Sequence, residues 1–301
     1  MSATPDPYVV AVDTGERIHY LDWGRPRPDA PALLLVHGLG QTGWIWAPLA
    51  RRLAGLAHVL APDLRGHGLS EAPRQGYDLE SLAYDMLTVL VGSGYGDQAA
   101  RRVVVAGHGF GAMVAATMAR LQPESVSALA LIDGGWEEME DATGLSADEF
   151  LRGLAEPPEI LRSTDEFLAD RREYDPASWD EDQEGAAMAT VRVTHAGHLA
   201  PVTKPHVLAG CVQAMFGYRP PEKFGLAREP VLVVVAGGGS ADDEEARERS
   251  LALDDIVSLR DERGLPTTTL QLTGVGHNVM RYEPDRLAAA LRPLLVGSAS
   301  G

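Results

Sequence analysis

The 301-residue sequence has little cysteine, few basic residues and no long apolar run. Its single cysteine, Cys211, excludes an internal disulfide and a cysteine-cluster zinc site. The sequence has 26 Lys and Arg residues and 43 Asp and Glu residues, so the net charge is −17. Nucleic acid would be repelled, because no run of Lys or Arg exceeds two residues. No apolar run approaches the roughly 20 residues of a membrane-spanning helix.

The amino-terminal residues lack a basic segment followed by an apolar one, so no secretory signal peptide is expected and the cytoplasm is the expected compartment. Hydrophobic residues make up 45% of the chain and charged residues 23%, which is typical of a globular protein in water. The length fits one large α/β domain, or a core with an inserted subdomain.

Short apolar or β-branched segments predict six strands, at residues 31–36, 58–61, 102–106, 126–132, 231–236 and 267–272. Helical patterns lie between or after them, at residues 44–53, 79–91, 111–121, 241–263 and 283–295. This alternation predicts an α/β fold with a mostly parallel, twisted sheet and helices on both faces. Residues 8–13 and 17–22 predict an antiparallel pair that extends one edge of the sheet.

Residues 134–228 have helical character and many charges but no convincing strand. They predict a helical cap inserted between two core segments, residues 1–133 and 229–301. The alternative is a disordered acidic insertion. Apolar anchors distributed through the segment favour the cap, because a disordered chain has few such residues. These anchors are Trp136, Phe150, Phe167, Trp179, Met188 and Phe216.

Four motifs follow the expected strands along the chain. They read His37-Gly-Leu-Gly40, Asp63-Leu-Arg-Gly-His-Gly-Leu-Ser70, Gly107-His-Gly-Phe-Gly111 and Gly274-Val-Gly-His277. Their order, and their positions at strand ends where open α/β sheets bind ligands, resemble the α/β-hydrolase superfamily over residues 8–295. The third motif is similar to the nucleophile elbow Gly-x-Ser-x-Gly, which joins a strand to a helix. Gly109 stands at the position of the serine.

The resemblance implies a catalytic site around Gly109. His277, between the last expected strand and the final helix, corresponds to the general base of the family. Asp133 directly ends the expected strand 126–132, where haloalkane-dehalogenase-like and some lactonase-like members have the acid that orients the base. Asp242 and Asp243 are the alternative, because relatives most often have the acid after the penultimate parallel strand.

The resemblance also implies an oxyanion hole made by the backbone N–H groups of Leu39 and Phe110, which a change of side chain at residue 109 leaves intact. We expect His108 to flank the site without replacing the nucleophile. For the tryptophans, core packing is the alternative to a role in the pocket. No metal and no organic cofactor are expected. The residues assigned to a pocket for a small apolar or acyl-containing molecule are His37, Gly38, Trp44, His108 and Trp136.

Glycine adopts the strained conformation of an elbow at no steric cost, so its effect on folding is expected to be neutral or stabilising by roughly 0.5–1 kcal/mol. Three functional hypotheses follow. The first is an ester, lactone or related acyl hydrolase, inactive or severely impaired because its serine is replaced, naturally or by mutation. The second is cofactor-free chemistry by His277 and Asp133, through an activated water or as a lyase, cyclase or isomerase. The third is ligand binding without turnover. The retained histidine and aspartate favour the first hypothesis.

Overall fold

The computed structural model describes residues 4–95, 103–154, 163–174, 176–237 and 244–297. An eight-stranded sheet has the strand order β1-β2-β4-β3-β5-β6-β9-β10. Neighbouring strands from β4 to β10 are parallel, whereas β1 and β2 form an antiparallel edge. The predicted mostly parallel sheet is therefore confirmed. Its strands are β1 Asp6–Ala11, β2 Arg17–Asp22, β3 Ala32–Val36, β4 His58–Pro62, β5 Val103–His108, β6 Val126–Ile132, β9 Val231–Ala236 and β10 Thr267–Leu272.

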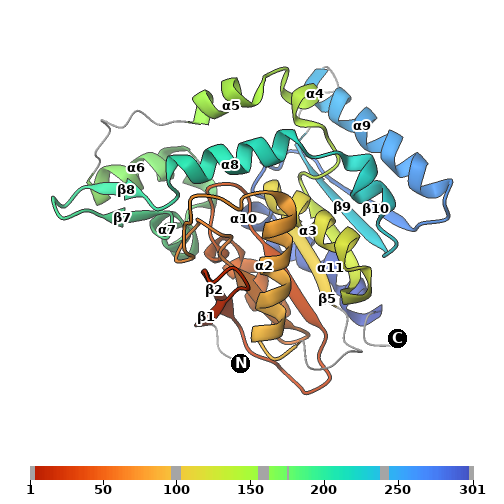
Figure 1. Cartoon of the computed structure of the whole chain (residues 1–301), viewed down its shortest axis with the longest axis horizontal. Coiled ribbons are helices and arrows are strands. Elements are labelled where there is room, and N and C mark those ends of the chain that lie inside the picture. Colours follow the sequence, from red (N-terminus) through yellow and green to blue (C-terminus); the bar gives the residue numbers. More distant parts are fainter. Residues whose placement is uncertain (1–3, 96–102, 155–162, 175, 238–243, 298–301) are drawn as a thin grey trace.

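Helices cover both faces of this sheet (Figure 1). The main ones are α1 Ala47–Leu53, α2 Leu79–Gly92, α3 Phe110–Leu121, α9 Glu244–Asp261, α10 Val279–Tyr282 and α11 Pro284–Gly297. A 3₁₀ helix, η1 (Gly43–Trp46), precedes α1. The periodicity predicted η1 and α1 as one helix, and it did not predict the four-residue α10.

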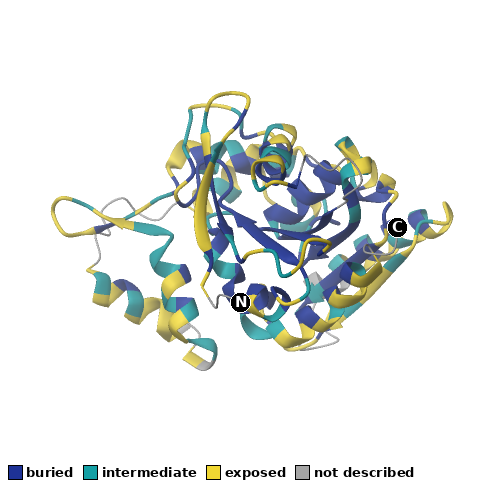
Figure 2. Ribbon diagram, turned by 90° about the horizontal axis from the view of Figure 1, so that it is seen from below, coloured by how far each residue is buried: buried dark blue, intermediate teal, exposed yellow. Residues whose placement is uncertain are grey.

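Successive side chains of a strand point to opposite faces, and β3 shows the result. Leu34 and Val36 pack in one apolar cluster with α2, α3 and α9. Leu33 and Leu35 pack in a second cluster with α1, α10 and α11. Strands β3 to β5 are buried along their whole length, and their sequences are apolar apart from His58 and His108 at strand ends (Figure 2). The carboxyl ends of these buried strands carry the loops of the candidate site.

Between β6 and β9 the chain forms five α-helices and a small hairpin within the described residues. These are α4 Met139–Thr143, α5 Ala147–Leu154, α6 Thr164–Tyr174, α7 Glu181–Met188, α8 Pro205–Phe216, and the antiparallel strands β7 Val191–Val193 and β8 Leu199–Pro201. The expectation that this segment contains no strand is wrong. Strands of three residues are too short to give a periodic pattern. The boundaries of the cap at residues 134 and 228 stay a prediction.

Side chains of this segment contact side chains of the core that lie far away in the sequence. Arg51 of α1 forms an ion pair with Asp182 of α7. The guanidinium of Arg281, on α10, lies 5.8 Å from the ring centroid of Trp179, which precedes α7. The inserted segment therefore contacts the same loop region that carries His277.

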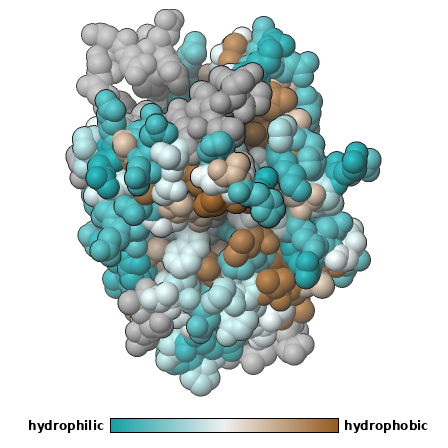
Figure 3. Space-filling view, turned by 90° about the vertical axis from the view of Figure 1, so that its left-hand side faces the viewer, coloured by the Kyte–Doolittle hydropathy of each residue, from teal (hydrophilic) through white to brown (hydrophobic). Residues whose placement is uncertain are grey.

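The surface seen from the side of β7 and β8 shows small apolar groups separated by hydrophilic residues (Figure 3). None of the described helices has both the length and the apolar character needed to cross a bilayer. The cytoplasmic location and the absence of a nucleic-acid partner stay predictions.

Candidate active site

Gly109 forms the sharp turn between β5 and α3, with φ 52° and ψ −116°. The two flanking glycines have no room for a side chain. A Cβ on Gly107 would overlap the backbone of Gly111, and a Cβ on Gly111 would overlap the carbonyl oxygens of Val36 and His37. The glycine pattern of the elbow therefore has a steric cause, namely the close approach of the turn to β3 and to itself.

His277 lies opposite this turn. Its Nδ1 atom is 2.6 Å from Oδ2 of Asp133, so Nδ1–H donates to the carboxylate and Nε2 is turned toward Gly109. A Cβ placed on Gly109 would lie 3.3 Å from Nε2 and 3.5 Å from Cε1 of His277. Apart from the chain neighbours of Gly109, no other atom of the described residues would lie within 4 Å of that Cβ. An oxygen attached to it would be within reach of the imidazole.

Asp133 follows β6 directly and its side chain is only 2% exposed. Oδ1 accepts hydrogen bonds from the N–H of Ala236 and from Arg249, both at 3.0 Å, which leaves Oδ2 for His277. Burial alone would raise the pKa of Asp133, but the hydrogen bond from His277 and the charge of Arg249 outweigh burial and hold the pKa below its usual range. The carboxylate is therefore ionised at neutral pH. The alternative acids Asp242 and Asp243 lie outside the described residues.

The ring of His108 packs against the ring of His277, with centroids 4.3 Å apart. His108 is fully buried, and burial lowers its pKa to about 3, so the ring is neutral. Its Nε2–H donates to the backbone oxygen of His277 at 3.0 Å. His108 thus supports the loop that carries His277 from a buried position, and its assignment to the substrate pocket stays a prediction.

Two other predicted pocket residues are also buried. His37 donates from Nδ1 to the oxygen of Gly38 at 2.8 Å and accepts at Nε2 from the N–H of Leu64 at 2.9 Å. It is fully buried and holds the loop after β3 in place. Trp136 is 1% exposed and packs in the core, with the guanidinium of Arg249 5.3 Å from its ring centroid. Trp44, in η1, is half-buried.

The backbone supplies donors beside the elbow. Phe110 is the first residue of α3, where N–H groups have no partner within the helix. Within the described part of the chain, neither Phe110 nor Leu39 donates its N–H to a protein acceptor. The neighbouring Gly38 N–H, by contrast, donates to Oε1 of Gln41 at 3.0 Å. The N–H groups of Phe110 and Leu39 therefore have no protein acceptor among the described residues, and their role as oxyanion donors stays a prediction.

Sequence reasoning did not find Gln41, Asn278 or Arg249. Gln41 donates from Nε2 to Oδ1 of Asn278 at 2.7 Å, so it joins the loop after β3 to the loop of His277. Its place directly after His37-Gly-Leu-Gly40, and that of Asn278 directly after His277, were the available signals. Arg249 gave no signal, because a charged residue in an exposed helical pattern is usually solvated.

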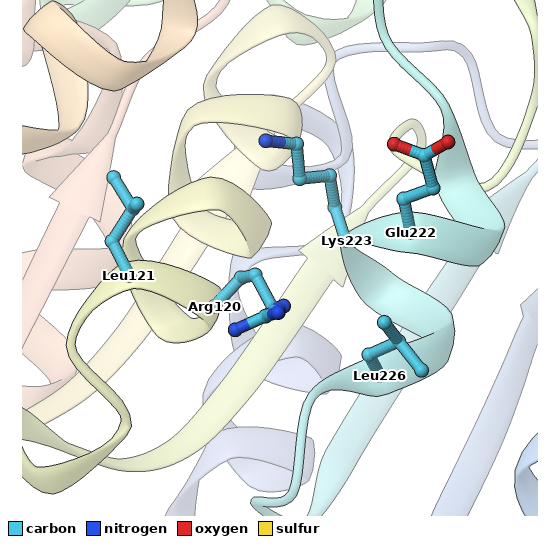
Figure 4. A pocket seen from close by; sticks show the side chains of 5 residues that line it. All are labelled: Arg120, Leu121, Glu222, Lys223 and Leu226. Carbon is cyan, nitrogen blue, oxygen red and sulfur yellow. The ribbon is translucent and has the colours of Figure 1, made fainter.

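A surface cavity of about 400 Å³ lies elsewhere, at the carboxyl end of α3 (Figure 4). It is lined by Arg120, Leu121, Glu222, Lys223 and Leu226. Gly109 precedes the opposite end of α3, about 17 Å away at 1.5 Å per helical residue. This cavity is therefore separate from the candidate active site. In the described ranges, no three His, Cys, Asp or Glu side chains gather closely enough to hold a metal ion.

With this geometry established, comparisons with known proteins identify the family. Residues 33–290 match the alpha/beta hydrolase family, and the chain belongs to it. This confirms the resemblance inferred from the four motifs, and with it the α/β-hydrolase fold.

Among curated proteins, epoxide hydrolase 4 of Homo sapiens is 35% identical over 128 residues, which cover 42% of this chain and 33% of that protein. The match thus spans about a third of that relative. Among solved structures, E-2-(acetamidomethylene)succinate hydrolase has a TM-score of 0.75 at 21% identity, covering 97% of this chain and 100% of that one. A thioesterase domain from the curacin biosynthetic pathway has a TM-score of 0.72 at 20% identity, covering 96% and 99%. At these identities the two structures show a shared fold.

Proposed function

We propose that this protein is a hydrolase of the α/β-hydrolase family for a small ester, lactone or related acyl molecule, with its covalent step disabled by Gly109. One observation carries the proposal: Nε2 of His277 lies 3.3 Å from the position that a Cβ of residue 109 would take. A hydroxyl on that carbon is what a histidine base activates for attack on an acyl carbon. The N–H groups of Leu39 and Phe110 are the proposed oxyanion donors.

The absence of a hydroxyl has a defined consequence. No acyl-enzyme forms at residue 109, and water must attack the substrate directly. In serine triads that lack one member, the remaining apparatus still accelerates the reaction by about 10³–10⁴-fold over water. We therefore expect the chain to be inactive or severely impaired toward substrates that need a covalent intermediate.

The decisive experiment restores the hydroxyl. Gly109→Ser should gain hydrolysis of p-nitrophenyl acetate, and His277→Ala in that background should remove the gain. Gly109→Ala is the matched control, because it adds the same Cβ and the same backbone strain without a nucleophile. A Gly109→Ser protein that is folded and no more active than Gly109→Ala would refute the proposal.

A second candidate function uses the chain without a serine. His277 keeps its hydrogen bond to an ionised carboxylate, and its Nε2 faces a position that, apart from the chain neighbours of Gly109, no other described side chain approaches within 4 Å. Such a base removes a proton from a water molecule, or from the substrate itself in a lyase, cyclase or isomerase step.

Turnover by the unchanged protein tests this second function. Lactones and simple epoxides are suitable probes, the latter because a curated relative is named an epoxide hydrolase. Turnover that His277→Ala abolishes supports it, and turnover that survives this substitution contradicts it. Saturable binding of a small ligand without any product would favour the third hypothesis, a binding protein.

A further inference from the structure

Asp133 is held by helix α9 as well as by His277. Nη2 of Arg249 lies 3.0 Å from Oδ1 of Asp133, and Nε of Arg249 lies 3.1 and 3.2 Å from the two carboxylate oxygens of Glu137. The three side chains are 24% exposed for Arg249, 2% for Asp133 and 13% for Glu137. Starting from the contact of His277 with Asp133, the negative Asp133, the positive Arg249 and the negative Glu137 follow one another in a row. These three side chains are largely shielded from water.

We propose that Arg249 is a positioning residue, which fixes the carboxylate of Asp133 and keeps the imidazole of His277 neutral over a wider range of pH. The inference rests on the proposed function, in which His277 acts as a base. A base must be unprotonated before it accepts a proton, so the charge of its carboxylate partner decides how much of it is available.

The charge of Arg249 affects His277 through the carboxylate of Asp133, which has one oxygen on each of them. An unpaired carboxylate beside an imidazole stabilises the imidazolium form, and the effect is strong where water is excluded. A guanidinium on the other carboxylate oxygen opposes that stabilisation. Glu137 moderates it in turn, because this second carboxylate shares the guanidinium.

The groups that face Asp133 come from several elements. His277 comes from the loop before α10, Arg249 from α9 and the N–H of Ala236 from the end of β9. His108 of β5 contributes no charge, because burial lowers its pKa to about 3. Arg249 is thus the cation that faces Asp133 directly among the described residues.

The backbone of Asp133 is strained. Asp133 has φ 47°, the one positive φ of a non-glycine residue among those described, and such a strained conformation persists only where its surroundings hold it. Its carboxylate is fixed on one side by Arg249 and Ala236, which both bind Oδ1. This arrangement leaves Oδ2 aimed at His277. Removing Arg249 should therefore loosen the orientation as well as change the charge.

The test is an NMR titration of the His277 ring, whose signal is identified by its loss in His277→Gln. In Arg249→Met the titration midpoint should rise by about 0.5–1 pH unit, the scale on which one neighbouring charge acts. Arg249→Lys keeps the charge and should move the midpoint less. Arg120→Met removes the same charge from the far end of α3 and should leave the midpoint unchanged.

Glu137→Gln is a second, independent variant. It removes the anion that shares Arg249, so the midpoint should fall. An unchanged midpoint in folded Arg249→Met, or a rise in Glu137→Gln, would overturn the inference. If Arg249→Met does not fold, Glu137→Gln decides.

The titration requires no turnover, so the two proposals fail separately. A Gly109→Ser protein without esterase activity whose His277 ring responds to Arg249→Met would refute the proposed function and leave the role of Arg249 standing. In an active Gly109→Ser protein, Arg249→Met should shift the acid limb of the plot of kcat/KM against pH to higher pH. The shift should equal the rise of the His277 titration midpoint.

Discussion

The backbone of Gly134 lies directly against the backbone of Gly109: a Cβ on Gly134 would be 2.7 Å from the Cα of Gly109 and 2.9 Å from its carbonyl oxygen. The N–H of Gly109 also donates to the oxygen of Ile132 at 3.0 Å. The elbow and the segment that carries Asp133 are therefore packed as one unit. This contact brings an acid at the end of β6 within reach of a base opposite residue 109.

Gly134→Ala should accordingly destabilise the protein by about 1–3 kcal/mol, the usual cost of forcing atoms into a filled site. Urea denaturation measures the loss. Gly153→Ala is the matched control, because a Cβ at this position of α5 meets nothing within 4 Å. Alanine there should stabilise the helix by up to about 1 kcal/mol. Equal stabilities of Gly134→Ala and the parent chain would contradict the close packing.

Asp133→Asn tests the proposed acid. An amide carries no charge and can present its NH₂ to Nδ1, which favours the wrong tautomer of His277. In the Gly109→Ser background, kcat should fall by about 10²–10⁴-fold, as for the corresponding change in serine triads. Steady-state esterase kinetics provide the measurement. Asp285→Asn is the control, because Asp285 is exposed, pairs with Arg52 and should not affect kcat. A loss below threefold would assign the role of acid elsewhere.

Gln41→Leu should separate the loop after β3 from the loop of His277. The substitution leaves the N–H of Gly38 without the Oε1 acceptor and frees Asn278. We expect a stability loss of about 1–2 kcal/mol. In the Gly109→Ser background kcat should drop by about tenfold with little change in KM, because the catalytic loops lose their mutual alignment. Gln213→Leu, at an exposed position of α8, should change neither parameter. A change confined to KM would indicate a role in substrate binding.

The buried histidines predict a loss of stability in mild acid. Burial lowers the pKa of His67 and of His108 to about 3, whereas both titrate near 6.5 in the unfolded chain. Between these values the unfolded state binds protons that the folded state does not. Each histidine should therefore make its whole contribution to the free energy of unfolding above about pH 6.5. As the pH drops toward 3, that free energy should fall by about 1.4 kcal/mol per pH unit for each histidine.

Urea denaturation at pH 7, 6 and 5 measures this slope. His67→Gln should make the slope shallower by about one proton. His195→Gln, at an exposed position of the β7–β8 turn, should leave it unchanged. Parallel slopes for His67→Gln and the parent chain would show that burial of His67 is not a source of the acid lability.

Much of the sheet was predictable because its signal is local. The bounds of β6 and β9 coincide with apolar runs in the sequence, since a strand covered on both faces needs an unbroken apolar side-chain row. The bounds of the edge strand β10 coincide with a threonine-rich segment, whose β-branched residues favour a strand although most of them are exposed. Strand β5 extends two residues further than predicted, to His108, because the backbone there pairs with the end of β6. Glycine and histidine give no strand signal of their own, so only the neighbouring strand reveals this extension.

The residues of the candidate site also fall into two groups, those with a local signal in the sequence and those that only tertiary contacts reveal. Gly109 and His277 were found from motifs, which record local stereochemistry. The burial of His108, His37 and Trp136, and the contact of Arg249 with Asp133, depend on which loops come to lie side by side. Nothing in the sequence around residue 249 marks it, although its guanidinium contacts a carboxylate 116 positions earlier in the chain.

The sequence alone determined the alternation of strands and helices, the glycine-rich elbow and the glycine at its centre, because side-chain size and backbone freedom act between near neighbours. The tertiary structure decided which carboxylate contacts His277, which histidine supports its loop and which cation neutralises the acid. Those contacts join residues separated by more than a hundred positions, and only the order of strands in the sheet brings them together.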